Sequence, residues 1–185
     1  MEATSWTPTF AWVATAAGAL ALALVAPEES VVMGRLPAPI TAKRLDQQQV
    51  SLPQGLPAER TLAIVAFRRQ QRAEVQSWID GLKLKEGSPI TWVRMPVLED
   101  PGNEPERKRI EARLLERHTQ PADRSRLVPL FTDREAFIRA ARLSGTEHAS
   151  VLVLDRQGRV LARVEGEFDE AKAQALKETL LAQND

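Results

Sequence analysis

Residues 150–166, SVLVLDRQGRVLARVEG, give the strongest indication of how this chain folds. Two extended apolar runs, at 150–155 and 159–165, stand on either side of a short turn. The turn contains Gly158, which adopts a positive φ without steric cost, and it follows Asp155, whose carboxylate can accept hydrogen bonds from the turn backbone. This pattern predicts an antiparallel β-hairpin.

Upstream of the hairpin, strand-like and helix-like patterns alternate. Residues 61–67, TLAIVAF, form a nearly continuous apolar run, which is typical of a strand buried on both faces of a sheet. Trp78 and Trp92 occupy core-facing positions and are expected to be packing residues. Further strands are predicted at 40–43 and 48–52 as a small hairpin, at 90–98 and at 126–131, and helices at 71–84, 103–118, 132–143 and 169–183. This order predicts an α/β sandwich around a mixed sheet.

The segment 103–118 has the clearest amphipathic helix pattern. Glu111 is expected to pair with Arg107 one turn earlier, and Arg113 and Arg117 continue the polar side. We expect this face to be solvated and to carry weak ion pairs, and the alternative is a basic docking surface.

Residues 10–26, FAWVATAAGALALALVA, form an uncharged run of 17 residues. This length falls within the range of about 17–25 residues for a membrane-spanning helix. A signal peptide would begin with basic residues, whereas residues 1–9 contain Glu2 and no lysine or arginine. The alternatives are cleavage near Ala23 and a buried helix of the domain. The sequence favours a retained signal or anchor over 1–26, which places the remainder outside the cytoplasmic membrane, on the periplasmic side.

The segment 27–39 contains three prolines and is predicted to be an extended tether. A single domain is predicted to follow at 40–185. The whole chain has 25 basic and 25 acidic residues and a formal net charge of zero. This balance argues against a nucleic-acid partner, because such a partner normally requires a basic stripe.

Cysteine is absent from all 185 residues. Disulfides, thiol redox chemistry, cysteine nucleophiles, thiolate zinc sites and iron–sulfur clusters are therefore excluded. His118 and His148 are the only histidines, and a metal site needs three or four ligands. No metal or other cofactor is predicted, and both histidines are expected to lie at the surface or in loops.

Three stretches carry a resemblance to a known superfamily. Residues 45–67, LDQQQVSLPQGLPAERTLAIVAF, resemble the opening of peroxiredoxin and TlpA-type domains, where a short hairpin precedes the first core strand. Residues 127–143, LVPLFTDREAFIRAARL, and 150–166 are similar to the second half of those domains, which contains a D-x-x-G-x-V/I turn. The residues that match this turn are Asp155, Gly158 and Val160. The resemblance covers 40–182 and implies a thioredoxin-like three-layer sandwich with a mixed central sheet, here preceded by an N-terminal apolar helix.

The differences from redox-active members of this superfamily are chemical. Those members carry a catalytic cysteine pair directly after the first core strand, where residues 67–72 of this chain read FRRQQR. They also place a cis-proline before the strand equivalent to 150–155, where residues 146–149 read TEHA. Both parts of the redox site are missing, so thiol–disulfide exchange and peroxide reduction are excluded.

A cysteine-poor branch of the superfamily is more similar. It contains the thioredoxin-like assembly factors of the mitochondrial ATP synthase membrane sector and their bacterial relatives. Those proteins have a Ser/Arg-type turn after the first strand and a run similar to residues 150–163, SVLVLDRQGRVLAR. This resemblance implies a non-catalytic helper of a membrane complex that is held near the bilayer and has a protein partner.

Arg68, Arg69 and Arg72 surround the predicted start of the helix at 71–84. Helix N-termini favour anions, and the arginine fork binds a carboxylate with two hydrogen bonds. We therefore predict a candidate anion site, which could hold an acidic segment of a partner; the alternative is three surface arginines that only solvate a loop. By the resemblance, His148 would lie near the same end of the sheet.

Three functions remain open at this point. The leading one is a membrane-tethered, non-redox binding or assembly module. The second is a small-ligand or anion binder, or a cysteine-independent enzyme, at the Arg68–Arg72 helix end. The third is a purely structural periplasmic domain. An enzyme predicts a pocket that joins Arg68, Arg72 and His148 with a strongly perturbed titration, whereas a binding module predicts an exposed apolar or arginine patch.

Overall fold

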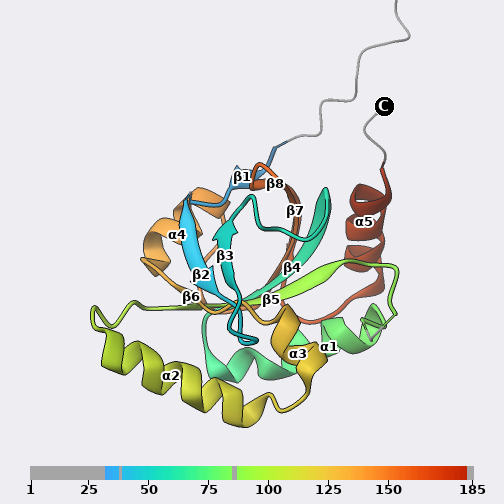
Figure 1. Ribbon diagram of the computed structural model, residues 1–185. Coiled ribbons are helices and arrows are strands. Elements are labelled where there is room, and N and C mark those ends of the chain that lie inside the picture. Colours follow the sequence, from blue (N-terminus) through green and yellow to red (C-terminus); the bar gives the residue numbers. More distant parts are fainter. Residues whose placement is uncertain (1–31, 38, 85–86, 183–185) are drawn as a thin grey trace, which may run out of the picture. The chain divides into compact units, whose positions relative to one another are not determined.

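Eight strands and five α-helices make up the described part of the chain (Figure 1). The computed structural model describes residues 32–37, 39–84 and 87–182. The strands are β1 (Gly34–Arg35), β2 (Ile40–Lys43), β3 (Gln49–Leu52), β4 (Arg60–Ala66), β5 (Trp92–Leu98), β6 (Leu130–Phe131), β7 (Ser150–Asp155) and β8 (Arg159–Glu165). The helices are α1 (Arg72–Gly81), α2 (Glu104–Arg117), α3 (Pro121–Arg126), α4 (Arg134–Ala141) and α5 (Glu170–Leu181), and a single 3₁₀ turn at Arg69–Gln71 precedes α1.

Strand β4 lies in the middle of a six-stranded sheet with the order β1-β8-β7-β4-β5-β6. It pairs in parallel with β5, where Ile64 lies opposite Arg94, and antiparallel with β7, where Ile64 lies opposite Val151. Residues 61–65 are all buried, as expected for a strand covered on both faces. The predicted mixed sheet is confirmed, and so is the separate small hairpin of β2 and β3.

The hairpin of β7 and β8 is also confirmed. Its turn is fixed by Asp155, which accepts hydrogen bonds at Oδ1 from the backbone N–H of Gln157 at 2.9 Å and of Arg159 at 2.8 Å. Gly158 has a φ of +75°, a conformation that favours glycine. The turn chemistry expected from the sequence is therefore present.

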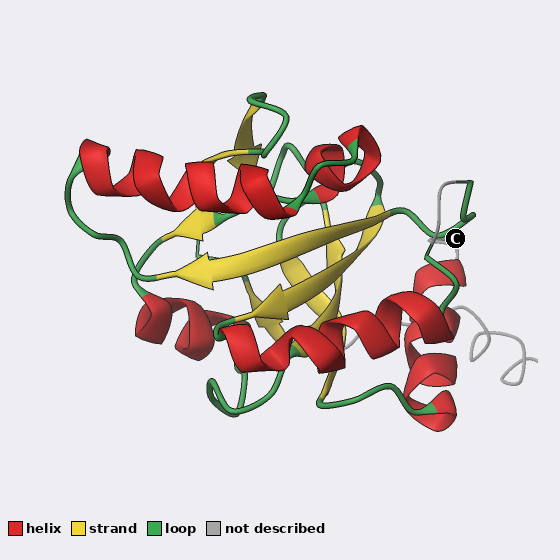
Figure 2. Cartoon of the chain, turned by 90° about the horizontal axis from the view of Figure 1, so that it is seen from below, coloured by secondary structure: helices red, strands yellow, loops and turns green. Residues whose placement is uncertain are grey.

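Helices cover both faces of the sheet (Figure 2). On one face, α4 and the β2–β3 hairpin enclose a core around Phe137. On the other face, α1 and α5 enclose a core around Trp78, whose indole Nε1 donates to the Gly166 carbonyl at 2.8 Å. Trp78 and Trp92 are both buried, so their prediction as packing residues is confirmed.

The strand predicted at 126–131 is mostly wrong. Its first residue belongs to α3, and regular strand pairing is limited to β6. Two prolines explain the difference. Pro121 begins a short helix, because its missing N–H has no intrahelical partner in the first turn, and Pro129 cannot donate to a neighbouring strand.

The predicted ion pair between Glu111 and Arg107 on α2 is wrong as well. Arg107 instead pairs with Asp100 in the loop before the helix, and Glu111 pairs with Lys43 of β2 at 2.7 Å. The sequence pattern considered only neighbours on the helix, whereas the fold brings closer partners from elsewhere. No residue of α2 is fully buried, which agrees with the expected solvated face.

The predicted apolar helix at 10–26 lies outside the described residues. Among the residues that are described, no helix is both long and apolar enough to cross a bilayer. Part of the predicted tether is ordered against the domain, because β1 pairs with β8 and places Gly34 opposite Val160. A side chain at Gly34 would come within 2.7 Å of the Ala141 carbonyl oxygen, so the close approach of β1 to α4 requires glycine.

Candidate functional site

The turn after β4 is organised by one buried glutamine. Gln71 is 2% exposed, and its side-chain oxygen accepts hydrogen bonds from the backbone N–H of Phe67 at 2.7 Å and of Arg68 at 3.0 Å. Its side-chain nitrogen donates to the Thr146 carbonyl at 2.9 Å. These three bonds satisfy a buried amide and fix the backbone from which the neighbouring arginines project.

Arg68 extends this connection to the loop before β7. Its guanidinium donates to the Thr146 hydroxyl at 2.9 Å and forms an ion pair with Glu147 at 2.9 Å. The side chains of Arg68 and Glu147 are 45% and 73% exposed, so this pair contributes little to stability. No cis peptide bond occurs in residues 146–149, which agrees with the absence of proline there.

His148 lies beside the same loop but contacts a different group. Its Nδ1 is 3.2 Å from a carboxylate oxygen of Glu74 on α1, and the other oxygen of Glu74 accepts from the Ala149 backbone N–H at 2.6 Å. The His148 side chain is 61% exposed and does not line the arginine cavity described next. The structure therefore does not bring His148 and Arg72 into one pocket.

Arg68, Arg69 and Arg72 do share a cavity, of about 430 Å³, on the α1 side of the sheet. We call it the arginine cavity. Its basic lining residues come from the turn before α1, from the first residue of α1, from β5 and from the end of α2; they are Arg68, Arg69, Arg72, Arg94, Arg117 and His118. The remaining lining residues are apolar, namely Ile64, Ala66, Val75, Pro96, Leu114 and Leu127. No carboxylate is among these lining residues, so the cavity is positively charged.

Arg94 is the most constrained of these charges. It projects from a central strand and is half-buried, yet it forms no ion pair within 4.0 Å and no side-chain hydrogen bond with any described residue. Burial lowers the pKa of Arg94; the charge of Asp123 opposes this effect, and the charge of Arg72 adds to it. A guanidinium remains protonated in proteins, so Arg94 keeps a poorly compensated charge at the cavity.

His118 is the titratable group of the cavity. It directly follows the last residue of α2 and is half-buried, so it lies in a loop, as predicted, but with part of its side chain covered. Burial lowers the pKa of His118 below its ordinary value of 6.5, and the charge of Arg94 lowers it further, whereas Asp123 acts in the opposite sense. His118 therefore favours its neutral form when the cavity holds no anion.

The sequence analysis missed Arg94, Arg117 and His118 as members of the site. Arg94 did give a signal, because it is the one charged residue in the apolar run at 90–98. In a strand that is buried on both faces, a charged side chain must lie against other elements of the fold. Arg117 and His118 gave no local signal, since they reach the cavity only through the position of α2 in the folded chain.

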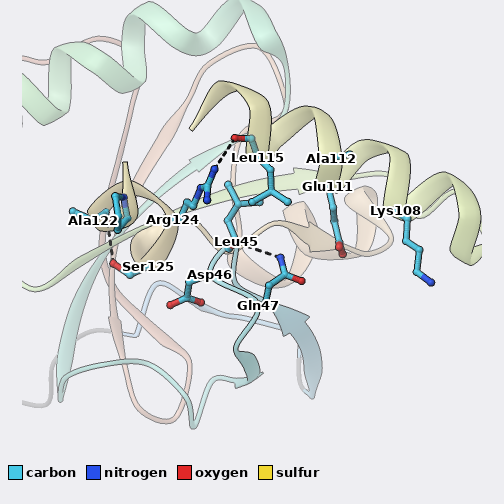
Figure 3. Close-up of a pocket in the computed structure, with 11 residues that line it drawn as sticks. Leu45, Asp46, Gln47, Lys108, Glu111, Ala112, Leu115, Ala122, Arg124 and Ser125 are labelled. Atoms are coloured by element: carbon cyan, nitrogen blue, oxygen red, sulfur yellow. Dashed lines mark hydrogen bonds between the residues drawn. The ribbon is translucent and has the colours of Figure 1, made fainter. Parts of the chain in front are cut away.

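A second, larger hollow of about 860 Å³ lies between the turn at 45–47 and helices α2 and α3 (Figure 3). Its lining mixes apolar side chains such as Leu45 with charges of both signs, including Lys108 and Glu111. Arg124 donates here to the Leu115 carbonyl at 3.2 Å and to the His118 carbonyl at 2.6 Å. The lining of this hollow does not favour any one class of ligand. Its relevance to the arginine cavity is that Arg124 fixes the end of α2, next to Arg117 and His118.

Comparison with known proteins gives structural likeness only. No protein-family model matches the sequence, and no curated protein matches it. A member of the Sco family of cytochrome c oxidase assembly proteins, BsSco, shares 16% identity, covers 81% of this chain and 96% of its own, and superimposes with a TM-score of 0.51. A candidate electron transfer protein from Aquifex aeolicus VF5 shares 14% identity and covers 83% and 99% of the two chains, with a TM-score of 0.56.

A third solved structure names the fold. The exposed lipoprotein thioredoxin Etrx1 of Streptococcus pneumoniae strain TIGR4 shares 14% identity and covers 76% of this chain and 99% of its own, with a TM-score of 0.50. Likeness at this identity establishes the fold and not the activity. The strand order, the helices on both faces and these superpositions agree with one another. The described part of this chain therefore has a thioredoxin-like fold, and the sequence contains no cysteine.

Proposed function

We propose that this chain is a non-redox, thioredoxin-like binding module that holds an anionic group in the arginine cavity. The observation that carries the proposal is Arg94, a half-buried guanidinium without an ion-pair partner within 4.0 Å in the described part of the chain. Four further arginines line the same cavity. An anion would supply the missing negative charge and accept charge-assisted hydrogen bonds.

The lining favours binding over catalysis. An enzyme at this end of the domain was expected to join Arg68, Arg72 and His148, but His148 contacts Glu74 instead. The residues that line the cavity include no serine, threonine, aspartate or glutamate that could act as nucleophile or acid. His118 alone, without a group to activate, supports no reaction class.

The test is calorimetric titration of the chain with inorganic phosphate and with sulfate. Arg94→Met is expected to weaken binding at least about tenfold, because a hydrogen bond to a charged group contributes about 1.5–3 kcal/mol. Arg139→Met, an exposed arginine on α4 on the other face of the sheet, is the matched control and should leave binding unchanged. Absence of phosphate and sulfate binding at millimolar concentrations, or equal binding by wild type and Arg94→Met, would refute the proposal.

We further propose that the module is anchored through residues 10–26 on the periplasmic side and acts on a protein partner in a membrane complex. Support comes from the uncharged run and from the resemblance to assembly factors. BsSco, which has the same fold, belongs to a family of cytochrome c oxidase assembly proteins. Affinity capture of the full-length chain in mild detergent, followed by mass spectrometry, tests both parts. One membrane complex recovered with residues 1–26 intact would support them, and a chain cleaved near Ala23 and recovered alone would contradict them.

A further inference from the structure

Three of the elements that line the arginine cavity, β5, α1 and α2, each contribute both a basic and an apolar side chain to it. On the sheet, Ile64 lies opposite Arg94 and Ala66 lies opposite Pro96, so these four residues share one face. On α1, Arg72 and Val75 are three positions apart and therefore lie on the same side of the helix. As many apolar residues as basic residues therefore line the cavity.

The end of α2 repeats this arrangement. Leu114, Arg117 and His118 lie at the spacing i, i+3 and i+4, which places them on one face of the helix, and all three line the cavity. Leu114 is only half-buried, so its side chain remains partly accessible. The apolar contribution is therefore part of the cavity wall and not only of the core beneath it.

We propose that the anion held here is a small organic dianion of the phosphate monoester type, with its charged head among the arginines and an apolar body against Ile64, Ala66 and Leu114. This inference rests on the proposed function, because it specifies the ligand of the same site. Of the five arginines that line the cavity, only Arg68 has an ion-pair partner within 4.0 Å in the described part of the chain, namely Glu147, so two negative charges compensate the remaining excess better than one. A phosphate group presents oxygens that match the planar fork of arginine.

The volume supports an organic body in addition to the head group. A cavity of about 430 Å³ has the space of about 14 water molecules, far more than a phosphate group requires. It falls within the range of about 300–1,000 Å³ that is typical of small-molecule sites. Inorganic phosphate would leave water against the apolar side chains, whereas an alkyl chain would displace it.

The experiment compares inorganic phosphate with ethyl, butyl and hexyl phosphate, and hexyl phosphate with hexanoate. Calorimetry is performed on the full-length chain in mild detergent at about pH 8, above the second phosphate pKa of about 6. The affinity is expected to rise about two- to fourfold for each added methylene, since full burial of a methylene corresponds to about fourfold. Hexyl phosphate is expected to bind about tenfold more tightly than hexanoate.

Substitutions test which cavity residues contact the charged head of the ligand and which contact its apolar body. Leu114→Gln should reduce the gain in affinity per added methylene, whereas Arg94→Met should weaken the binding of every member of the series. Ala66→Ser is a second, smaller change to the apolar wall that does not depend on the stability of α2. Gln76→Ala, an exposed substitution on α1 away from the cavity, is the control.

The outcomes separate this inference from the proposed function. If inorganic phosphate binds as tightly as hexyl phosphate, the proposal that the ligand has an apolar body is wrong, while the proposal of an anion site stands. If hexanoate binds as tightly as hexyl phosphate, the proposal that the head group is a dianion is wrong. Absence of binding by every anion would refute both proposals, and binding that Arg94→Met does not weaken would move the ligand to another site.

Discussion

Gln71 and Thr146 are 75 residues apart in the sequence, and the amide of Gln71 donates to the Thr146 carbonyl at 2.9 Å. The same amide accepts from two backbone N–H groups at the end of β4. In redox-active members of the superfamily that the sequence resembles, these two segments hold the cysteine pair and the cis-proline. In this chain a neutral, buried side chain joins the two segments.

Gln71→Leu is expected to destabilise the domain by about 1–3 kcal/mol, because the N–H of Phe67 and the carbonyl of Thr146 would lose their partner. Urea denaturation followed by tryptophan fluorescence measures this change. The control is Gln70→Leu at the exposed neighbouring position, which should change the free energy of unfolding by less than about 0.5 kcal/mol. Equal stability of the two variants would contradict the role assigned to Gln71.

Arg124 is predicted to act as a positioning residue for the arginine cavity. It donates to the carbonyls of Leu115 and His118 and so fixes the C-terminal end of α2. Arg124→Lys keeps the charge but loses the planar fork that reaches both carbonyls, so phosphate affinity should fall several-fold at constant net charge. Hydrogen exchange of the α2 amides should increase in the same variant. Ser125→Ala, a change in the same hollow (Figure 3), serves as the control, and unchanged affinity in Arg124→Lys would contradict this prediction.

His118 should couple anion binding to pH. Its folded-state pKa is lowered by burial first and by the charge of Arg94 second, so His118 is neutral above that lowered value. An anion beside it raises the pKa, and binding is therefore expected to tighten as the pH falls through that range. Sulfate is the suitable probe, because it does not titrate there. His118→Asn should abolish the pH dependence and keep binding at high pH, whereas a pH dependence that survives the substitution would assign it to another group.

The same lowered pKa has a consequence for stability. Between the folded-state pKa and the ordinary value of 6.5, the unfolded chain binds the His118 proton and the folded chain does not. Stability is therefore expected to rise with pH in this window and to be lost as the pH falls through it. Denaturation of wild type and His118→Asn at several pH values measures the difference, and parallel pH profiles would contradict the assignment.

The parts of the fold that depend on local sequence were predictable. The hairpin of β7 and β8 follows from alternation, Asp155 and Gly158, all within 16 residues. The short helix α3 was not predicted, because its six residues are too few for a helical period to stand out. The predicted ion pair between Arg107 and Glu111 was also wrong, since their actual partners, Asp100 and Lys43, come close to them only in the folded chain.

The candidate site divides in the same way. Arg68, Arg69 and Arg72 are close in the sequence and directly follow one predicted strand, so the sequence was enough to predict that they lie together. Arg94 and His118 reach the cavity from β5 and from the end of α2, and no local pattern relates them to Arg72. The resemblance placed His148 near the same end of the sheet as the arginines, but it gave no information on the direction in which the side chain points.

The pairing of β4 between β5 and β7 also bears on the order in which we expect the parts of the domain to fold. The strands of the β7–β8 hairpin are joined by a short turn, whereas Ile64 and Val151, opposite each other on β4 and β7, are 87 residues apart. Hairpins form in about 1–10 μs, whereas distant pairings must first overcome the entropy of closing a long loop. We expect pulsed hydrogen exchange to detect protected amides in 150–165 before those in 60–66. The central strand of the sheet would then be among the last to acquire its hydrogen bonds, and the arginine cavity, which needs β4, β5 and α2 together, would exist only at the end of folding.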